Sequence, residues 1–209
     1  MTGFGDAGQN FIAGLPSAEM KLDMLWDATT TTGDFDVMRA FPTGVVTLLP
    51  EGYPALGANT ISLAFLAGNY APSGKPDGAI QLGSIACSAY GPTAYLERGW
   101  ALAHGIITNT LTGTGLLDPW ATGDLTEACS GVLHIWDATA TDTYVVKIQH
   151  CDTLAGVYTD LITFTLNGTA IGSERITVAS GTVHKYRRVL ATRTGAGDTF
   201  GFTVSFTHQ

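Results

Sequence analysis

The 209-residue sequence contains few charged residues and no long hydrophobic run. Charged residues make up 13% of the chain, about half the roughly 25% typical of globular proteins, and 45% of the residues are hydrophobic. Disordered chains combine high charge with low hydrophobicity, so disorder is excluded. No stretch approaches the ~18 consecutive apolar residues of a membrane helix. The first ten residues also lack the basic and apolar regions of a secretory signal, so we expect no membrane partner.

Positive charge is also scarce. The formal net charge is −8, of which −6 lies in residues 1–118 and −2 in residues 119–209. Proteins that hold nucleic acid do so mainly by neutralising phosphates, so this balance has the wrong sign for that function. The one basic cluster, Lys185, Arg187 and Arg188 beside His184, lies in an alternating run. We interpret that cluster as a solvated strand face rather than a binding patch.

Recognisable catalytic and metal-binding patterns are missing. Cys87, Cys129 and Cys151 have no CxxC spacing, which argues against a disulfide framework and against a zinc site. His150, Cys151 and Asp152 look like a nucleophile cluster, but neighbours on a strand point to opposite faces. The sequence also lacks a GxSxG elbow, a P-loop and an HExxH motif, and its five histidines are dispersed. We therefore predict no enzymatic activity, no cofactor and no metal site.

Helical periodicity is nearly absent, and strand patterns fill most of the chain. Only Asp34–Phe41 suggests a short helix, with Asp34 as its N-cap. Alternating or β-branched runs between Gly, Pro, Asp and Asn predict strands in the first half of the chain. These are Ala18–Trp26, Val45–Leu49, Thr60–Ala67, Ala79–Ala89 and Ala94–Ala103.

A second series of strands follows the Gly- and Thr-rich stretch Asn109–Gly123. These are Val132–Trp136, Thr143–His150, Tyr158–Leu166, Glu174–Val178, Val183–Ala191 and Thr199–Thr207. Turn signals every 8–12 residues are typical of a sandwich or jelly roll. The sequence therefore predicts an all-β protein: an N-terminal β-sandwich or barrel with one short helix over 1–110, a linker over 111–124 and a C-terminal β-sandwich, jelly-roll or Ig-like, over 125–209.

Two parts of the sequence resemble bacteriophage structural proteins. An alternating strand, an aromatic-Asp turn and a short Asp-led helix in Ala18–Phe41, with the later stretch Tyr95–Gly105, resemble the major tail, or tail tube, proteins of long-tailed bacteriophages. Val132–Ile135, Val146–Thr165 and the closing aromatic strand resemble an accessory β-sandwich domain that phage structural proteins often append. Cys151 and Tyr158 depart from that pattern, where a small residue and a Trp are more usual.

The resemblance implies a structural function in the virion tail. Tail tube proteins form stacked hexameric rings whose sheets join into a continuous inner barrel, through which DNA is ejected. Residues 1–110 would then be the ring-forming domain, and residues 125–209 would be an outer accessory domain. The implied partners are copies of the same chain, other tail proteins, and DNA that passes without specific binding. The chain would be synthesised in the host cytoplasm and reside in the tail.

Candidate residues follow from this implied role. Acids of the first part that could line the lumen are Glu19, Asp23, Glu51, Asp77 and Glu97. The Gly-rich segment Met1–Gly14 and the loop Ala71–Gly78 are candidates for arms that reach a neighbouring ring. Within them, the candidate inter-ring contacts are Gly3, Phe4, Phe11, Ser73, Lys75 and Asp77.

Two other functions fit the same pattern of strands and turns. One is a capsid decoration protein or another tail-associated structural protein. The other is a carbohydrate-binding module or adhesin, in which exposed Trp120, Tyr144 or Tyr158 of the C-terminal sandwich would stack on sugars.

Overall fold

The computed structural model describes residues 19–25, 43–48, 50, 55–73, 82–89, 96–119, 123–139, 141–195 and 197–208. These residues form strands, turns and loops with no helix, which confirms the predicted all-β class. The helix expected at Asp34–Phe41 lies outside the described residues. Within them, no helix is long and apolar enough to cross a membrane. The chain divides into two compact units, one of residues 1–43 and 63–96, the other of residues 44–62 and 97–209.

The first unit contains a three-stranded antiparallel sheet. Its strands are β1 (Glu19–Leu25), β4 (Leu82–Ala89) and the part of β3 (Asn59–Ser73) that follows Ser62, in the order β1-β4-β3. β1 and β4 pair over seven consecutive residues without a bulge. The alternating pattern of the sequence fits this pairing, because apolar Leu22 lies opposite Ile85 and polar Asp23 lies opposite Ser84.

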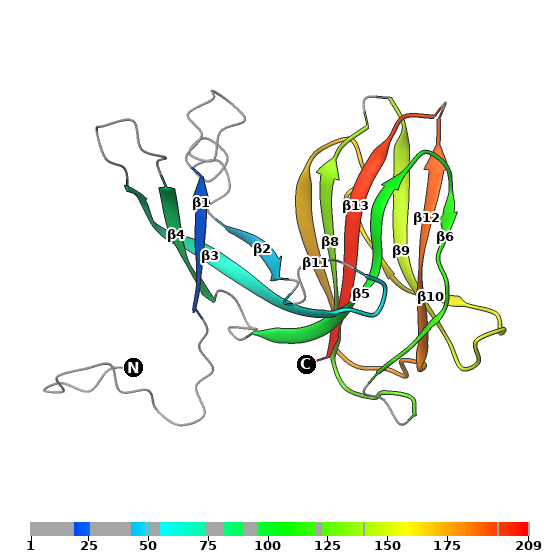
Figure 1. Ribbon diagram of the computed structural model, residues 1–209. Helices are drawn as coiled ribbons and strands as arrows, with labels where there is room; N and C mark the ends of the chain where they lie inside the picture. The colour runs from blue at the N-terminus through cyan, green and yellow to red at the C-terminus, as the bar shows by residue number, and fades with distance from the viewer. Residues whose placement is uncertain are drawn as a thin grey trace, which may run out of the picture. The chain divides into compact units, whose positions relative to one another are not determined.

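The second unit is a β-sandwich of two antiparallel sheets (Figure 1). In the first sheet the order is β5-β13-β8-β11, and the start of β3 pairs with β5 while β2 pairs with β3. Their bounds are Thr43–Leu48 for β2, Glu97–Ile107 for β5, Cys129–Asp137 for β8, Gly172–Val178 for β11 and Phe200–His208 for β13.

The second sheet of the sandwich has the order β10-β9-β12-β6, and β7 also pairs with β12. Its strands are β6 (Leu111–Thr112), β7 (Leu116–Leu117), β9 (Thr143–Cys151), β10 (Thr159–Thr163) and β12 (Tyr186–Thr194). The predicted strand Val183–Ala191 starts earlier than β12. Val183 forms an isolated bridge with Leu125 instead, and the regular pairing begins at Tyr186.

The hydrophobic core lies between these two sheets, and β13 supplies its aromatic centre. The side chains of Phe200, Phe202 and Phe206 are at most 1% exposed. Phe200 stacks on Phe202 with ring centroids 4.9 Å apart, and Tyr144 from the opposite sheet stacks on Phe200 at 4.5 Å. Burying one such side chain contributes roughly 1.5–3 kcal/mol, so alternation along this single strand stabilises both sheets.

The observed division of the chain differs from the predicted one. Residues 111–124, expected to be a linker, include β6 and β7, and both pair with β12 in the sandwich. β5, placed by the prediction in the N-terminal domain, pairs with β13 along most of its length. The Gly- and Thr-rich composition of this stretch does not separate two domains, because Leu111 and Leu116 pack against the sandwich core.

Candidate functional site

A row of polar side chains crosses the outer face of the first sandwich sheet. The strand register places His104 of β5 opposite Thr203 of β13, and Thr203 opposite His134 of β8. The row continues to β11, where Ser173 lies opposite His134. Directly opposed residues in a sheet share a face and lie close enough to interact. His104 Nδ1 and Thr203 Oγ1 are accordingly 2.8 Å apart, within hydrogen-bonding distance.

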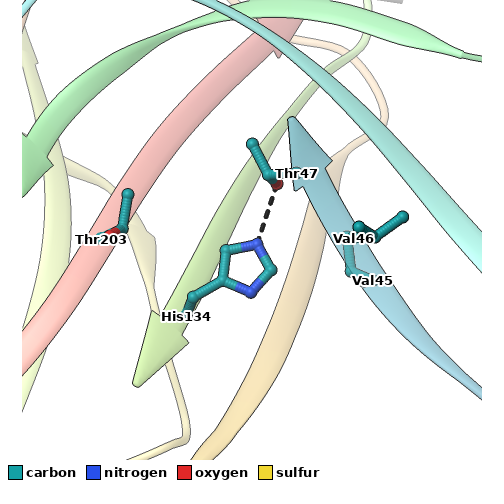
Figure 2. Close-up of a pocket in the computed structure, with 5 residues that line it drawn as sticks. All are labelled: Val45, Val46, Thr47, His134 and Thr203. Atoms are coloured by element: carbon teal, nitrogen blue, oxygen red, sulfur yellow. Dashed lines mark hydrogen bonds between the residues drawn. The ribbon is translucent and has the colours of Figure 1, made fainter. Parts of the chain in front are cut away.

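Strand β2 contacts this row and forms one wall of a cleft (Figure 2). Thr47 Oγ1 lies 2.8 Å from His134 Nε2 and 2.9 Å from Ser62 Oγ. The Val45 backbone N–H donates to Ser173 Oγ at 3.4 Å. The cleft has a volume of about 260 Å³ and is lined by Val45, Val46, Thr47, His134 and Thr203. That is slightly smaller than the roughly 300–1,000 Å³ of a typical small-molecule site.

Burial favours the neutral form of both histidines of the row. Burial lowers the pKa of His134 from 6.5 to about 4, and burial also lowers the pKa of His104. A neutral imidazole presents one hydrogen-bond donor and one acceptor. The described residues that line the cleft therefore offer hydrogen-bonding groups without a formal charge. This chemistry suits a polar packing contact better than an ionic ligand.

One charged pair is buried on the sheet to which this row belongs. Arg175 of β11 donates from Nε to Glu97 Oε2 at 2.7 Å, and its Nη2 contacts Glu97 Oε1. Glu97, at the start of β5, is 2% exposed. Glu97 was expected to line the lumen, but the structure places it in a buried ion pair. A buried, ion-paired carboxylate presents no free charge to passing DNA.

The basic cluster does not form the solvated strand face that we expected. Arg187 is fully buried in the sandwich, with Nη1 2.6 Å from Asp118 Oδ2. Its guanidinium lies 4.4 Å from the Phe206 ring centroid and 5.1 Å from that of Trp100. Burial lowers the pKa of Arg187, and the Asp118 carboxylate opposes that shift. For Arg187 the interpretation was therefore wrong, because its neighbours on other strands supply a counter-charge and aromatic rings.

The aromatic residues suggested for sugar stacking have different placements. Tyr144 is fully buried against Phe200, so its ring cannot stack on a sugar. Tyr158 is half-buried, and the Arg188 guanidinium lies 4.1 Å over its ring. Trp120 lies outside the described residues. The exposed tryptophan that the structure does show is Trp136 on β8, 42% exposed and 5.8 Å from the His104 ring.

Most of the residues proposed for a tube lie outside the described part of the chain. Glu19 and Asp23 belong to β1, and Ser73 is the last residue of β3, opposite Leu82 of β4. The structure does not describe Gly3, Phe4, Phe11, Glu51, Lys75 or Asp77.

The free edge of β11 is the most distinctive surface of the sandwich. β11 pairs with β8 over seven consecutive residues without a bulge, and no described strand pairs with its other edge. It contains no proline. Its two charged residues are engaged within the chain: Arg175 with Glu97, and Glu174 with the backbone N–H groups of Thr165 and Leu166 at 2.8 and 2.9 Å.

The edges of the second sheet are protected by comparison. β10 has five residues, and its pairing with β9 shifts register between Asp160 and Ile162. Asp160 carries an exposed charge that pairs with Lys147 at 2.6 Å. At the opposite side, β6 has only two residues. Short edge strands, bulges and charges are the usual means by which proteins prevent edge-to-edge association. β11 is longer and has no bulge in its pairing with β8, and its two charged residues are engaged within the chain.

Residues able to hold a metal ion meet at one end of the second sheet. One ligand atom each from Asp124, Asp152 and His184 lies within 4.8 Å of the other two. The sequence analysis missed this cluster, because its members come from three separate segments and none has a metal-ligand spacing. Asp118 and Asp124 are close in sequence but have different partners, Arg187 and His184.

Comparison with protein-family models, with curated proteins and with solved structures finds no match to this chain.

Proposed function

We propose that the protein is a virion structural protein that polymerises as stacked, hexameric rings to form the tail tube of a long-tailed bacteriophage. The observation that carries the proposal is the edge of β11 with which no described strand pairs. The resemblance of Ala18–Phe41 and Tyr95–Gly105 to tail tube proteins supplies the particular assembly. A subunit built to join sheets with its neighbours needs at least one such edge.

The composition of β11 supports pairing with another strand. Apart from Glu174 and Arg175, the strand consists of Gly172, Ser173, Ile176, Thr177 and Val178. Ile176 and Val178 pack against the sandwich core, so they hold the strand in place. The backbone edge then presents its N–H and C=O groups without a side-chain charge to repel a partner. A neighbouring strand that paired there would satisfy these groups and remove the edge.

The first unit also supports the proposal, because its described sheet ends in a strand, β1, that carries negative charge. β1 is the last described strand of its sheet, with β4 as its described neighbour. Glu19 and Asp23 alternate with Met20, Leu22 and Met24 along β1. In the proposed tube, acids at such positions repel the phosphate backbone, and the shortage of basic residues prevents DNA from adhering during ejection.

The proposal is tested by the assembly state of the purified full-length protein. Negative-stain microscopy and light scattering should show hexameric rings or hollow tubes. A capsid decoration protein would instead form small closed oligomers without tubes. A protein that stays monomeric at high concentration would contradict both structural roles.

A pair of charge substitutions tests whether the β11 edge makes the contact. Ser173 is exposed on β11, so Ser173→Lys adds a charge at the free edge and leaves the core unaltered, although it removes the hydroxyl that accepts from the Val45 N–H. We expect it to abolish or strongly reduce assembly while the far-UV circular dichroism spectrum stays unchanged. Thr192→Lys is the matched control, because Thr192 is an exposed residue of β12, an interior strand of the other sheet. Equal assembly of the two variants would show that β11 is not the joining edge.

A further inference from the structure

The end of the second sandwich sheet carries a cluster of two carboxylates and two imidazoles. Asp124 precedes the bridge residue Leu125, His184 follows the bridge residue Val183, and Asp152 follows the last residue of β9. Leu125 and Val183 exchange both backbone hydrogen bonds, each at 2.8 Å. This bridge holds Asp124 and His184 side by side.

Two of the three separations between the polar atoms are close to those between metal ligands, and all three lie within 4.8 Å. His184 Nδ1 lies 2.9 Å from Asp124 Oδ2 and 3.6 Å from Asp152 Oδ1. Zinc bound to nitrogen and oxygen at about 2.1 Å in a tetrahedron holds its ligand atoms about 3.4 Å apart. One divalent ion could therefore contact all three atoms after small side-chain movements.

The imidazole of His150 limits the orientation of the neighbouring His184. His150 Nδ1 accepts a hydrogen bond from the His184 backbone N–H at 3.0 Å. The two rings are stacked with centroids 4.8 Å apart. His150 therefore acts as a positioning residue, because its Nδ1 lone pair is already used and its ring limits the movement of His184.

We propose that Asp124, Asp152 and His184 form a binding site for a divalent transition-metal ion, for which Zn²⁺ is the best-fitting candidate. An imidazole nitrogen with two carboxylates is a ligand set that zinc accepts. Ca²⁺ and Mg²⁺ prefer oxygen ligands throughout, so the histidine disfavours them. The three protein ligands leave a fourth tetrahedral position for water or another donor.

The accessibility of the cluster is compatible with loading from solution. The side chains of His184 and Asp124 are each 32% exposed, and that of Asp152 is 68% exposed. Without a metal, His184 Nδ1 and Asp124 Oδ2 are hydrogen-bonded at 2.9 Å, and this hydrogen bond lowers the pKa of the Asp124 carboxyl. A bound cation would replace the proton shared by these two side chains.

Zinc titration of the full-length protein tests the site. After treatment with a chelator, isothermal titration calorimetry at neutral pH should show one saturable Zn²⁺ site per chain. Co²⁺ in place of Zn²⁺ should give visible absorption bands of the intensity typical of tetrahedral coordination. Absence of saturable binding in the micromolar range would overturn the proposal.

Matched variants locate the bound ion. Asp152→Asn and His184→Gln should each weaken Zn²⁺ binding at least tenfold, and Asp152 is exposed enough that its variant should fold normally. Asp160→Asn and His104→Gln are the controls, because each makes the same kind of substitution at a described residue outside the cluster. Equal weakening in controls and test variants, or undiminished binding in Asp152→Asn, would show that the ion binds elsewhere. None of these outcomes depends on whether the protein forms tubes.

Discussion

The two faces of β13 are both buried, but they are built from opposite chemistry. The face toward the sandwich core carries Phe200, Phe202, Val204 and Phe206, all at most 1% exposed. The outward face carries Thr203, Ser205 and Thr207, which are 9%, 1% and 0% exposed. A strand with one apolar and one polar face usually turns its polar face to water. Here the polar face is covered as well.

The difference shows how the sandwich obtains a second, polar interior. Small hydroxyl side chains on the outer face leave room for covering elements, and they bond to their surroundings: Thr203 to His104, and Thr207 to the Ser130 carbonyl at 3.4 Å. The interior of the sandwich also holds Arg187, whose charge is balanced by Asp118. Stability should therefore depend on packing at the inner face and on hydrogen bonding at the outer face.

The largest contrast is expected between neighbouring residues of β13. Phe202→Ala removes a buried ring that stacks on Phe200 and should lower the free energy of unfolding by about 3–5 kcal/mol. Thr203→Ala removes one side-chain hydrogen bond and should cost about 1 kcal/mol. Urea unfolding followed by fluorescence measures both. If Thr203→Ala lowered the free energy of unfolding as much as Phe202→Ala, the polar and apolar faces of β13 would contribute equally to stability.

The buried ion pair of the inner face gives the next largest effect. Asp118→Asn leaves the Arg187 charge without a compensating carboxylate in the core, and we expect a loss of about 3 kcal/mol. The matched change Asp160→Asn breaks an exposed pair with Lys147 and should cost at most about 1 kcal/mol. Comparable losses in the two variants would contradict the assignment of Arg187 as a buried cation whose charge Asp118 compensates.

His134, on the outer face of the first sandwich sheet, should make the stability of the protein depend on pH. The pKa of His134 is about 4 in the folded protein and 6.5 when the side chain is solvated. Between these values the unfolded state binds more protons, so stability present above pH 6.5 is lost as the pH falls towards 4, by at most about 3 kcal/mol.

The His134→Gln variant separates the contribution of His134 to acid sensitivity from that of the carboxylates and the other histidines. Gln keeps a hydrogen-bonding group near Thr47 and has no titration in this range. Chemical denaturation at a series of pH values should therefore give a shallower slope between pH 6.5 and 4 for the variant. An unchanged slope would assign the acid sensitivity to other groups, of which His104 and His150 also have lowered pKa values owing to burial.

Local patterns predicted the strands well and their environments poorly. The alternation in Thr199–Thr207 predicted β13 and the membership of its two faces, because side-chain direction in a strand depends only on adjacent residues. The same reasoning interpreted Arg187 as solvated, because its ion-pair partner Asp118 is 69 residues away. The linker interpretation of 111–124 failed to anticipate β6 and β7 for a similar reason, since two-residue strands are defined by their partner β12.

The sequence by itself determined the all-β class, the positions of most strands and the apolar face of β13, because a period of two is a property of the local chain. The tertiary structure decided which polar face would be buried, which arginine would enter the core, and that Asp124, Asp152 and His184 would meet. It also placed β11 last among the described strands of its sheet. These outcomes depend on which distant strands pair, and a local pattern of side chains does not specify the partner.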